Sequence, residues 1–361
     1  MKKQLLNMQL NDCNNDLNDF VYYLDQKTEL LTKSDAEAVR NYKIVAMTTT
    51  GCAKYSKILE KNNFEIIIIE EAAEVLESHI LSLLTSNTKR LILIGDHKQL
   101  RPKPYNYEIE TKYNFNISMF ERLINNNIPF SSLKFQRRMK PKFADFVRII
   151  YGKAEYKDYD DVLNRSNILG VEQDLYFITH NRYEGENSGI KSKFNDYEAI
   201  YLVKLCKYLL QQGYKSNQIT ILTFYLGQVL RIKKFLKEKL DEDLSKEIRV
   251  SSVDNYQGEE CDIILLSLVR SNKEYKIGFL KTFNRVCVAF SRAKLGLYII
   301  GNINCIIEGE KICQNKNQNK KNVNIKMLDV WQRIEAKAKE LNIIGDKLTL
   351  ICQTHHKKNN N

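Results

Sequence analysis

Two adjacent carboxylates end a strongly apolar run and could take part in hydrolytic chemistry. Ile66-Ile-Ile-Ile69 is followed directly by Glu70 and Glu71. Open α/β sheets bind ligands at the carboxyl ends of their strands, so one carboxylate could hold Mg²⁺ through water while the other orients an attacking water. The alternative is an acidic helix start, because Glu in a first turn suits the helix dipole. Taken alone, the pair does not decide between these two interpretations.

A second apolar run also ends in polar residues. Leu91-Ile-Leu-Ile94 precedes Gly95 and Asp96, and Gln99 lies just beyond them. A glutamine amide at such an edge can hydrogen-bond a γ-phosphate or its attacking water and report its loss. Gly-Asp after a strand is by itself an ordinary turn. Because it follows Glu70-Glu71 in the chain, the phosphate-sensing interpretation becomes the stronger one.

Two arginine-containing segments come later, Gln136-Arg-Arg-Met-Lys-Pro141 and Ser291-Arg-Ala-Lys294. From a second domain, such arginines could reach phosphates held by the first and neutralise transition-state charge, an effect of roughly 10³ to 10⁵ in rate. Arginine clusters are more often solvated surface, so the position of these segments carries the interpretation.

The polar stretch Ser251 to Asp262 separates two apolar runs, and its Gly258 allows close approach to a phosphate or sugar backbone. No Gly-x-x-x-x-Gly-Lys-Ser/Thr loop occurs in the chain. The backbone amides and lysine that cradle a triphosphate are therefore missing. The sequence predicts most of a nucleotide-driven motor without its phosphate cradle.

Continuous apolar runs predict strands buried on both faces, hence parallel sheets covered by helices. The predicted strands are Lys43–Met47, Glu65–Ile69, Arg90–Ile94, Leu175–Thr179, Ile219–Thr223, Arg249–Val253, Asp262–Leu266 and Leu297–Ile300. Helices are expected at Asn195–Gln211 and Gln228–Leu240. The predicted organisation is a helical lead-in (1–42), a first α/β domain (43–130), a second (131–308), and a polar linker, amphipathic helix and basic tail (309–361).

The amino-acid composition indicates what kind of partner the protein binds and where in the cell it is located. The 56 Lys and Arg exceed the 44 Asp and Glu, and the net charge of +12 favours a polyanionic partner. The eight cysteines include no Cys-x-x-Cys pair, which favours reduced thiols. The segment after Lys2-Lys3 is too polar for a signal peptide, and no apolar run reaches membrane-spanning length. We expect a cytoplasmic or nuclear protein with no membrane segment.

Six motifs in order resemble superfamily 1 helicases of the up-frameshift and senataxin type, over residues 43 to 302. They are Thr48 to Gly51, Glu70 to Ala73, Gly95 to Leu100, Gln136 to Met139, Gln257 to Glu260 and Arg285 to Lys294. The group with NFX-type zinc fingers is the most similar, through Ala46 to Gly51, Glu70 to Glu77, Gly95 to Pro102, Ser267 to Asn272 and Ile277 to Leu280.

This resemblance implies an α/β fold of tandem RecA-like parallel-sheet domains, the first truncated. It implies a 5′-to-3′ RNA helicase core that uses ATP and Mg²⁺. The implied partners are single-stranded or double-stranded RNA and proteins of RNA surveillance, small-RNA silencing or antiviral defence.

The resemblance also assigns roles motif by motif. Glu70 takes the place of the Mg²⁺-binding acid, through water, and Glu71 that of the catalytic carboxylate. Gln99 matches the γ-phosphate sensor, and Arg138 and Arg292 match the phosphate-contacting arginines. The nucleotide side includes Gly95, Asp96, Gly258, Glu260, Tyr225 and Gln228. The nucleic-acid backbone is matched to Thr48, Thr49, Thr50, Ser252, Asp254 and Asn255.

Two departures and several alternatives accompany this assignment. The broader family has Asp where Glu70 stands, and Cys287 replaces a common Asn. We expect a C-terminal piece of a larger helicase. The alternatives are a non-hydrolysing RNA-binding or scaffold protein derived from a helicase, and a DNA helicase or nuclease accessory. Cys352, His355 and His356 have ligand-like spacing but do not complete a tetrahedral zinc site, so a disordered tail is favoured.

Overall fold

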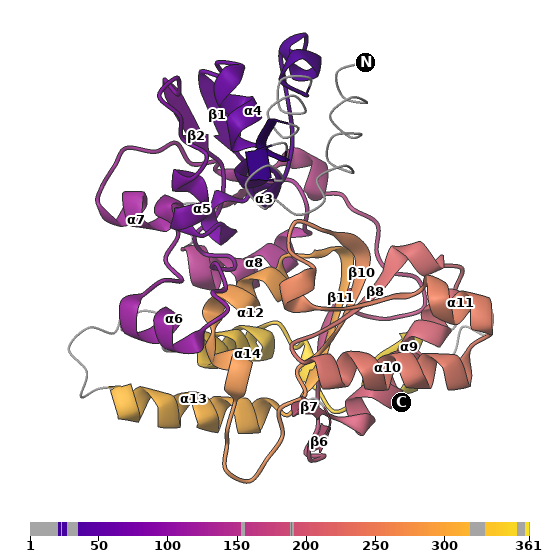
Figure 1. Ribbon diagram of the computed structural model, residues 1–361. Helices are drawn as coiled ribbons and strands as arrows, with labels where there is room; N and C mark the ends of the chain where they lie inside the picture. The colour runs from indigo at the N-terminus through magenta and orange to yellow at the C-terminus, as the bar shows by residue number, and fades with distance from the viewer. Residues whose placement is uncertain are drawn as a thin grey trace. The chain divides into compact units, whose positions relative to one another are not determined.

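The structure, a computed structural model, forms two compact units (Figure 1). It describes residues 21–22, 24–26, 35–152, 156–187, 189, 191–317, 329–351 and 358–360. Unit 1 comprises Met1–His97 and Arg101–Pro129, and unit 2 comprises Lys98–Leu100 and Phe130–Asn361. Most of the expected lead-in and all three candidate zinc ligands at the carboxyl end lie outside the described residues. Within the described part, no helix combines the length and apolarity needed to span a membrane.

Unit 1 contains two short parallel strands. In β1 (Ile66–Ile69) and β2 (Arg90–Leu93), Ile66 lies opposite Arg90 and Ile69 opposite Leu93. These strands confirm the predictions for this part of the chain. The other elements of unit 1 are α3 (Thr49–Lys54), α4 (Ser56–Lys61), η1 (Ala72–Glu74), α5 (Glu77–Leu81), α6 (Tyr107–Tyr113) and α7 (Met119–Asn125).

Two expectations for unit 1 are wrong. The segment Lys43–Met47 forms no strand, because neither strand of the described sheet pairs with it. The strand β1 is buried on one face only: Ile66 and Ile68 are 52% and 62% exposed, whereas Ile69 packs in a small core with Ile80. One apolar face of this sheet is therefore left uncovered by the described residues.

Unit 2 is an α/β layer structure with a six-stranded parallel sheet, which confirms the predicted fold class. The strand order is β12–β5–β11–β10–β8–β9. The strands are β5 (Leu175–Thr179), β8 (Ile219–Thr223), β9 (Arg249–Ser252), β10 (Cys261–Ser267), β11 (Ala293–Gly301) and β12 (Ile344–Gly345). The first five lie where the apolar runs predicted strands, while the two-residue β12 was not predicted.

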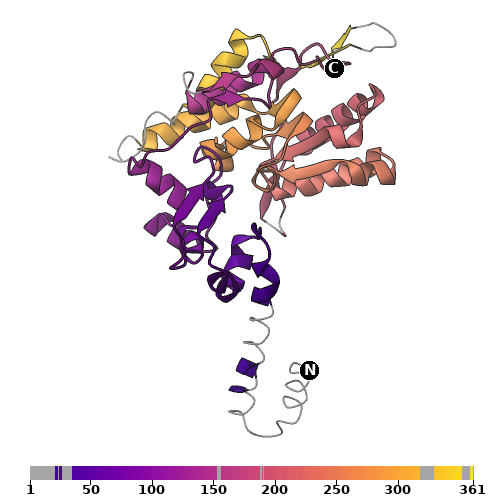
Figure 2. The ribbon, with the colours of Figure 1, turned by 90° about the horizontal axis from the view of Figure 1, so that it is seen from above.

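Helices cover both faces of this sheet (Figures 1 and 2). Alternation along β10 shows the two layers: Ile263 and Leu265 belong to one core, and Ile264 and Leu266 belong to the other. The first core includes side chains of α9 (Asp196–Gln211) and α10 (Leu226–Lys239). The second includes side chains of α8 (Pro141–Tyr151), α12 (Phe283–Phe290) and α14 (Val330–Glu340). This double burial explains the unbroken apolar runs.

The carboxyl-terminal helices belong to unit 2. The helix α13 (Ile303–Asn317) continues beyond residue 308, and α14 matches the predicted amphipathic helix. Trp331 of α14 is 1% exposed, packs edge-on against Phe290 and donates its indole N–H to the carbonyl of Leu280 at 2.8 Å. Glu310 of α13 accepts two amides of the first turn of α14, from Trp331 and Gln332. The helix α14 is thus part of the core of the unit.

Candidate functional site

The two carboxylates of unit 1 stand on a tight turn that is tied to both strands. The amide of Ile94 donates to the carbonyl of Ile69 at 2.9 Å, and the amide of Ala72 donates to the carbonyl of Ile94 at 2.8 Å. Between these bonds, Glu71 has φ of 53° and ψ of 36°, in the left-handed region. Non-glycine residues seldom adopt this conformation, and it often marks a functional turn. Glu70 is exposed beside it.

Gly95 brings the second polar turn of unit 1 against the first. A Cβ atom at this position would lie 2.9 Å from the amide nitrogen of Ala73 and 3.1 Å from that of Ala72. Only glycine therefore allows this approach. The predicted residues Glu70, Glu71, Gly95 and Asp96 thus share one edge of the β1–β2 sheet.

The three threonines lie at the start of α3. Thr48 caps this helix, and its hydroxyl oxygen accepts the amide of Gly51 at 3.1 Å. Thr48 and Thr50 are exposed and Thr49 is half-buried. Their predicted contact with a nucleic-acid backbone stays a prediction.

Gln99 and Arg292 contact each other in unit 2. The segment Lys98–Leu100 belongs to this unit, although the residues before and after it belong to unit 1. Arg292 is 1% exposed and donates from Nη2 to the Oε1 of Gln99 at 3.0 Å. The Nη1 of Arg292 donates to the carbonyl of Glu259 at 3.2 Å. Asn284 donates to the backbone carbonyl of Gln99, at 2.5 Å. The predicted phosphate sensor is therefore bonded to a predicted phosphate-contacting arginine.

Arg138 lies beside this pair and is held by Glu260. Its Nε donates to one oxygen of Glu260 at 2.6 Å, and its Nη1 donates to the carbonyl of Ser291 at 3.1 Å. Lys294 contacts the other oxygen of Glu260, also at 2.6 Å. The hydrogen bond from Lys294, followed by that from Arg138, lowers the pKa of Glu260 to about 2. The carboxylate thus stays ionised and keeps two cations together.

Unit 2 therefore gathers four predicted residues, Gln99, Arg138, Glu260 and Arg292. Gly258 lies in the adjoining loop with φ of 78°, a conformation that favours glycine. Sequence reasoning missed the roles of Lys294, Asn284 and Gln257, whose side-chain oxygen accepts the amide of Leu100 at 3.2 Å. Each lies in a quoted motif or next to one, and that proximity is the signal that could have identified them.

Tyr225 and Gln228 lie after β8 and serve the scaffold. Gln228 is fully buried, accepts the amide of Asn195 at 2.7 Å, and donates to the carbonyl of Asn195 and the hydroxyl of Ser267, both at 3.0 Å. The hydroxyl of Tyr225 accepts the amide of Phe279 at 3.1 Å. Both side chains fix neighbouring loops, and a nucleotide contact through them stays a prediction.

The residues after β9 differ in their availability. Ser252 is 8% exposed, and the two carboxylate oxygens of Asp254 accept from Nε and Nη2 of Arg285 at 2.8 and 3.1 Å. This ion pair partly neutralises Asp254. Asn255 is exposed, so it is the most accessible of the three residues expected to contact a nucleic-acid backbone.

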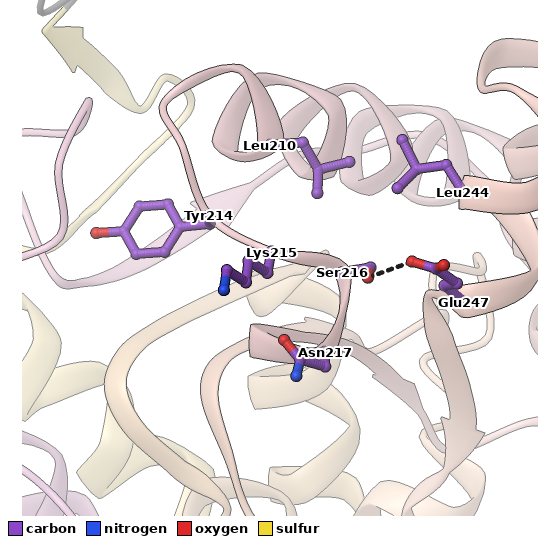
Figure 3. A pocket seen from close by; sticks show the side chains of 7 residues that line it. All are labelled: Leu210, Tyr214, Lys215, Ser216, Asn217, Leu244 and Glu247. Carbon is purple, nitrogen blue, oxygen red and sulfur yellow. Dashed lines mark hydrogen bonds between the residues drawn. The ribbon is translucent and has the colours of Figure 1, made fainter.

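A shallow pocket of about 710 Å³ lies elsewhere on unit 2 (Figure 3). Its lining includes Leu210 and Leu244 on one side and Lys215 on another, and Ser216 donates to Glu247 across it at 2.6 Å. No residue that we predicted for the site lines this pocket. The candidate site is therefore not this cavity.

Comparisons with known proteins agree with the motifs. Two family models, both described as AAA domain, match residues 2–103 and 115–304. Over 334 residues the chain is 43% identical to the NFX1-type zinc finger-containing protein 1 of Mus musculus, covering 92% of this chain and 16% of that protein. Over 296 residues it is 41% identical to the Helicase required for RNAi-mediated heterochromatin assembly 1 of Schizosaccharomyces pombe, covering 81% and 29%.

The matched segment thus spans less than a third of either relative. A third relative, the ATP-dependent helicase NAM7 of Saccharomyces cerevisiae, is 31% identical over 285 residues, covering 76% of this chain and 29% of that protein. Among solved structures, the PRRSV helicase aligns with a TM-score of 0.35 at 14% identity, covering 76% of this chain and 50% of that chain. A TM-score this low adds nothing to the sequence comparisons.

Proposed function

This chain belongs to the AAA-domain family of superfamily 1 helicases, as its motifs predict, and we propose that it forms part of the core of an ATP-dependent RNA helicase. The observation that carries this proposal is the hydrogen bond between Gln99 and the buried Arg292. A γ-phosphate sensor joined to an arginine can pass the presence or loss of a phosphate to the rest of the unit.

The exposed carboxylate Glu70 and the arginines Arg138 and Arg292 suit a magnesium–triphosphate complex. Mg²⁺ is usually held by one or two carboxylates together with phosphate oxygens and water, and Glu70 is an exposed carboxylate at a strand end. When bound, the ion would neutralise charge on the phosphates. Glu71 would orient the attacking water, and Arg138 and Arg292 would stabilise the charge that develops on the transferred phosphate.

The names of two relatives support RNA as the polymer. One relative is named for RNAi-mediated heterochromatin assembly, and another, 32% identical over 290 residues, is the RNA helicase aquarius of Mus musculus. The net charge of +12 also suits a polyanion. We therefore propose RNA unwinding or remodelling, in surveillance, small-RNA silencing or antiviral defence, in the cytoplasm or nucleus.

No P-loop motif occurs in these 361 residues, so hydrolysis under this proposal requires a phosphate cradle that they do not supply. The first measurement is the mass of the native protein, with an antibody raised against residues 140–161. A band far above 42.3 kDa supports a larger helicase that includes this chain. A band at that mass favours the second candidate, a non-hydrolysing RNA-binding protein.

The catalytic assignment is tested on the native protein by RNA-stimulated ATP hydrolysis. We expect Glu71→Gln to abolish turnover while RNA binding survives, and Glu74→Gln, three residues away on η1, to keep both activities. Turnover that persists in Glu71→Gln would remove Glu71 from the mechanism. For the second candidate, RNA binding would be sensitive to salt and unaffected by added ATP. Matched RNA and DNA strands distinguish the two polymers.

A further inference from the structure

The loop that follows β10 in unit 2 has a strained backbone. The amide of Arg270 donates to the carbonyl of Leu268 at 2.8 Å, which makes a γ-turn centred on Val269. Val269 has φ of 70° and is fully buried. A positive φ is unfavourable for a β-branched residue, so the surrounding structure must hold this turn in place.

Two buried carboxylates hold the turn. One oxygen of Glu198, which is fully buried, accepts the amide of Val269 at 2.8 Å and the hydroxyl of Ser267 at 2.6 Å. One oxygen of Glu184 accepts the amide of Ser271 at 2.7 Å and the Nε of Arg270 at 3.0 Å. Burying two carboxylates is costly unless they are well bonded. Here both carboxylates accept backbone amides of the same loop, so together they fix its conformation.

Glu184 also joins this loop to the one that follows β5. Its own amide donates to the carbonyl of Ser271 at 2.9 Å, so the two segments are bonded in both directions. Tyr183, next to Glu184, is 62% exposed. Lys273, two residues after Ser271, is also exposed, and its Nζ lies 5.9 Å from the centre of the Tyr183 ring. The bonded loops therefore present an exposed aromatic ring with a cation over one of its faces.

The position of this pair suits a ligand of stated chemistry. Both loops follow the carboxyl ends of parallel strands, the edge at which open α/β sheets bind ligands. An exposed aromatic ring stacks on a base of any sequence, and a neighbouring cation attracts the phosphate. The acidic neighbour Glu274 has its carboxylate 3.9 Å from the ammonium group of Lys276.

We propose that Tyr183 and Lys273 bind one nucleotide of single-stranded RNA, Tyr183 by stacking on the base and Lys273 by attracting a phosphate. Glu184 is a positioning residue that holds both loops. These three residues lie outside the motifs that carry the family resemblance. The proposal rests on the proposed function, because it names a contact for the same RNA partner.

The test measures binding of a fluorescent oligouridine to the 361-residue chain by anisotropy, over a range of salt concentrations. We expect Tyr183→Ala to bind about 5- to 150-fold more weakly, the range that loss of one stacked base gives. Tyr183→Phe keeps the ring and should bind within about twofold of the original chain. Lys273→Gln should reduce the slope of log affinity against log salt by about 0.7, whereas Tyr183→Ala should leave that slope unchanged.

Two controls separate the possible outcomes. Lys246→Gln removes an exposed lysine of α11 (Glu242–Glu247), at the opposite end of the strands, and should leave both affinity and slope unchanged. Glu184→Gln should weaken binding as Tyr183→Ala does, while the conservative Tyr183→Phe does not. If the original chain binds RNA and Tyr183→Ala binds it equally well, the stacking contact is refuted. If the original chain binds no RNA, the proposed function itself fails. Polyglutamate serves as an acidic polypeptide without bases. If Tyr183→Ala weakens binding of polyglutamate as much as binding of RNA, the surface recognises acidic protein segments and the proposed RNA contact is refuted.

Discussion

Removing the charge of Glu260 should destabilise unit 2 by an amount that depends on pH. Glu260 pairs with Arg138 and Lys294, both at 2.6 Å. Glu260→Gln keeps the shape of the side chain but removes both ion pairs. The variant therefore isolates the contribution of the charge.

The expected magnitude follows from the pKa and the exposure of the group. The hydrogen bonds from Lys294 and Arg138 lower the pKa of Glu260 from 4.5 to about 2, which would correspond to about 3 kcal/mol in the absence of solvent screening. The carboxylate is 40% exposed, so water screens it. Exposed ion pairs contribute roughly 0.2–1 kcal/mol each, so we expect a loss of about 0.4–2 kcal/mol for the two pairs.

The sign with pH is fixed by the lowered pKa. The stabilisation is fully present above the unfolded value of 4.5 and is lost as the pH falls from 4.5 towards 2. The difference in unfolding free energy between Glu260→Gln and the original chain should therefore be largest near neutral pH. It should narrow by about half near pH 3.2, midway between the two pKa values.

The assay is urea unfolding followed by tryptophan fluorescence. Trp331 is the single tryptophan of the sequence and is buried in the core of unit 2, so its emission reports the unfolding of that unit. The matched control is Glu259→Gln, whose carboxylate pairs with Arg249 instead. A Glu260→Gln difference that stays constant between neutral pH and about pH 3 would refute the role of the charge.

Three further predictions concern the interior of unit 2. Trp331→Ala should lower the free energy of unfolding by about 3–5 kcal/mol, because it leaves a cavity beside Phe290 and an unbonded carbonyl at Leu280. Urea unfolding followed by circular dichroism measures this loss. A loss below about 1 kcal/mol would contradict the packing described for Trp331. Glu198→Ala should lower the free energy of unfolding by about 2–4 kcal/mol in the same assay, since the buried amide of Val269 and the hydroxyl of Ser267 lose their acceptor. The control Glu238→Ala, at an exposed position, should change it by less than about 0.5 kcal/mol. Cys206 is fully buried, and burial raises the pKa of its thiol to about 12. It should therefore resist alkylation by iodoacetamide at mildly alkaline pH until urea unfolds the chain, as measured by mass spectrometry. Labelling of Cys206 in the native protein would show instead that unit 2 opens locally.

Local pattern predicted the elements whose burial is complete. Ile219–Thr223 is apolar enough, and buried enough on both faces, that its bounds follow from the sequence. The same rule failed for Lys43–Met47, because an apolar run becomes a strand only where a neighbouring strand offers hydrogen bonds. It also failed for the exposed face of β1, because burial depends on what packs against a strand.

The chemistry of the site was only partly predictable. The motifs identified Gln99, Arg138, Glu260 and Arg292, but not that Gln99 and Arg292 are hydrogen-bonded across 193 positions of sequence. Such long-range pairing leaves no periodic signal in the chain. The burial of Gln228 was equally invisible, because an amide that serves a nucleotide and one that braces a loop are the same residue type.

The assignment of Lys98–Leu100 to unit 2 bears on how this protein can be dissected. A fragment that begins at Phe130 would contain nearly all of unit 2 and its sheet, yet it would lack Gln99. The guanidinium of Arg292, buried and always charged, would then lose an acceptor, and the amide of Gln257 would lose the N–H that it accepts from Leu100. Such a fragment could fold and still misreport the affinity of the arginines for phosphate. A faithful dissection therefore keeps a three-residue piece of the chain that a boundary at residue 130 discards.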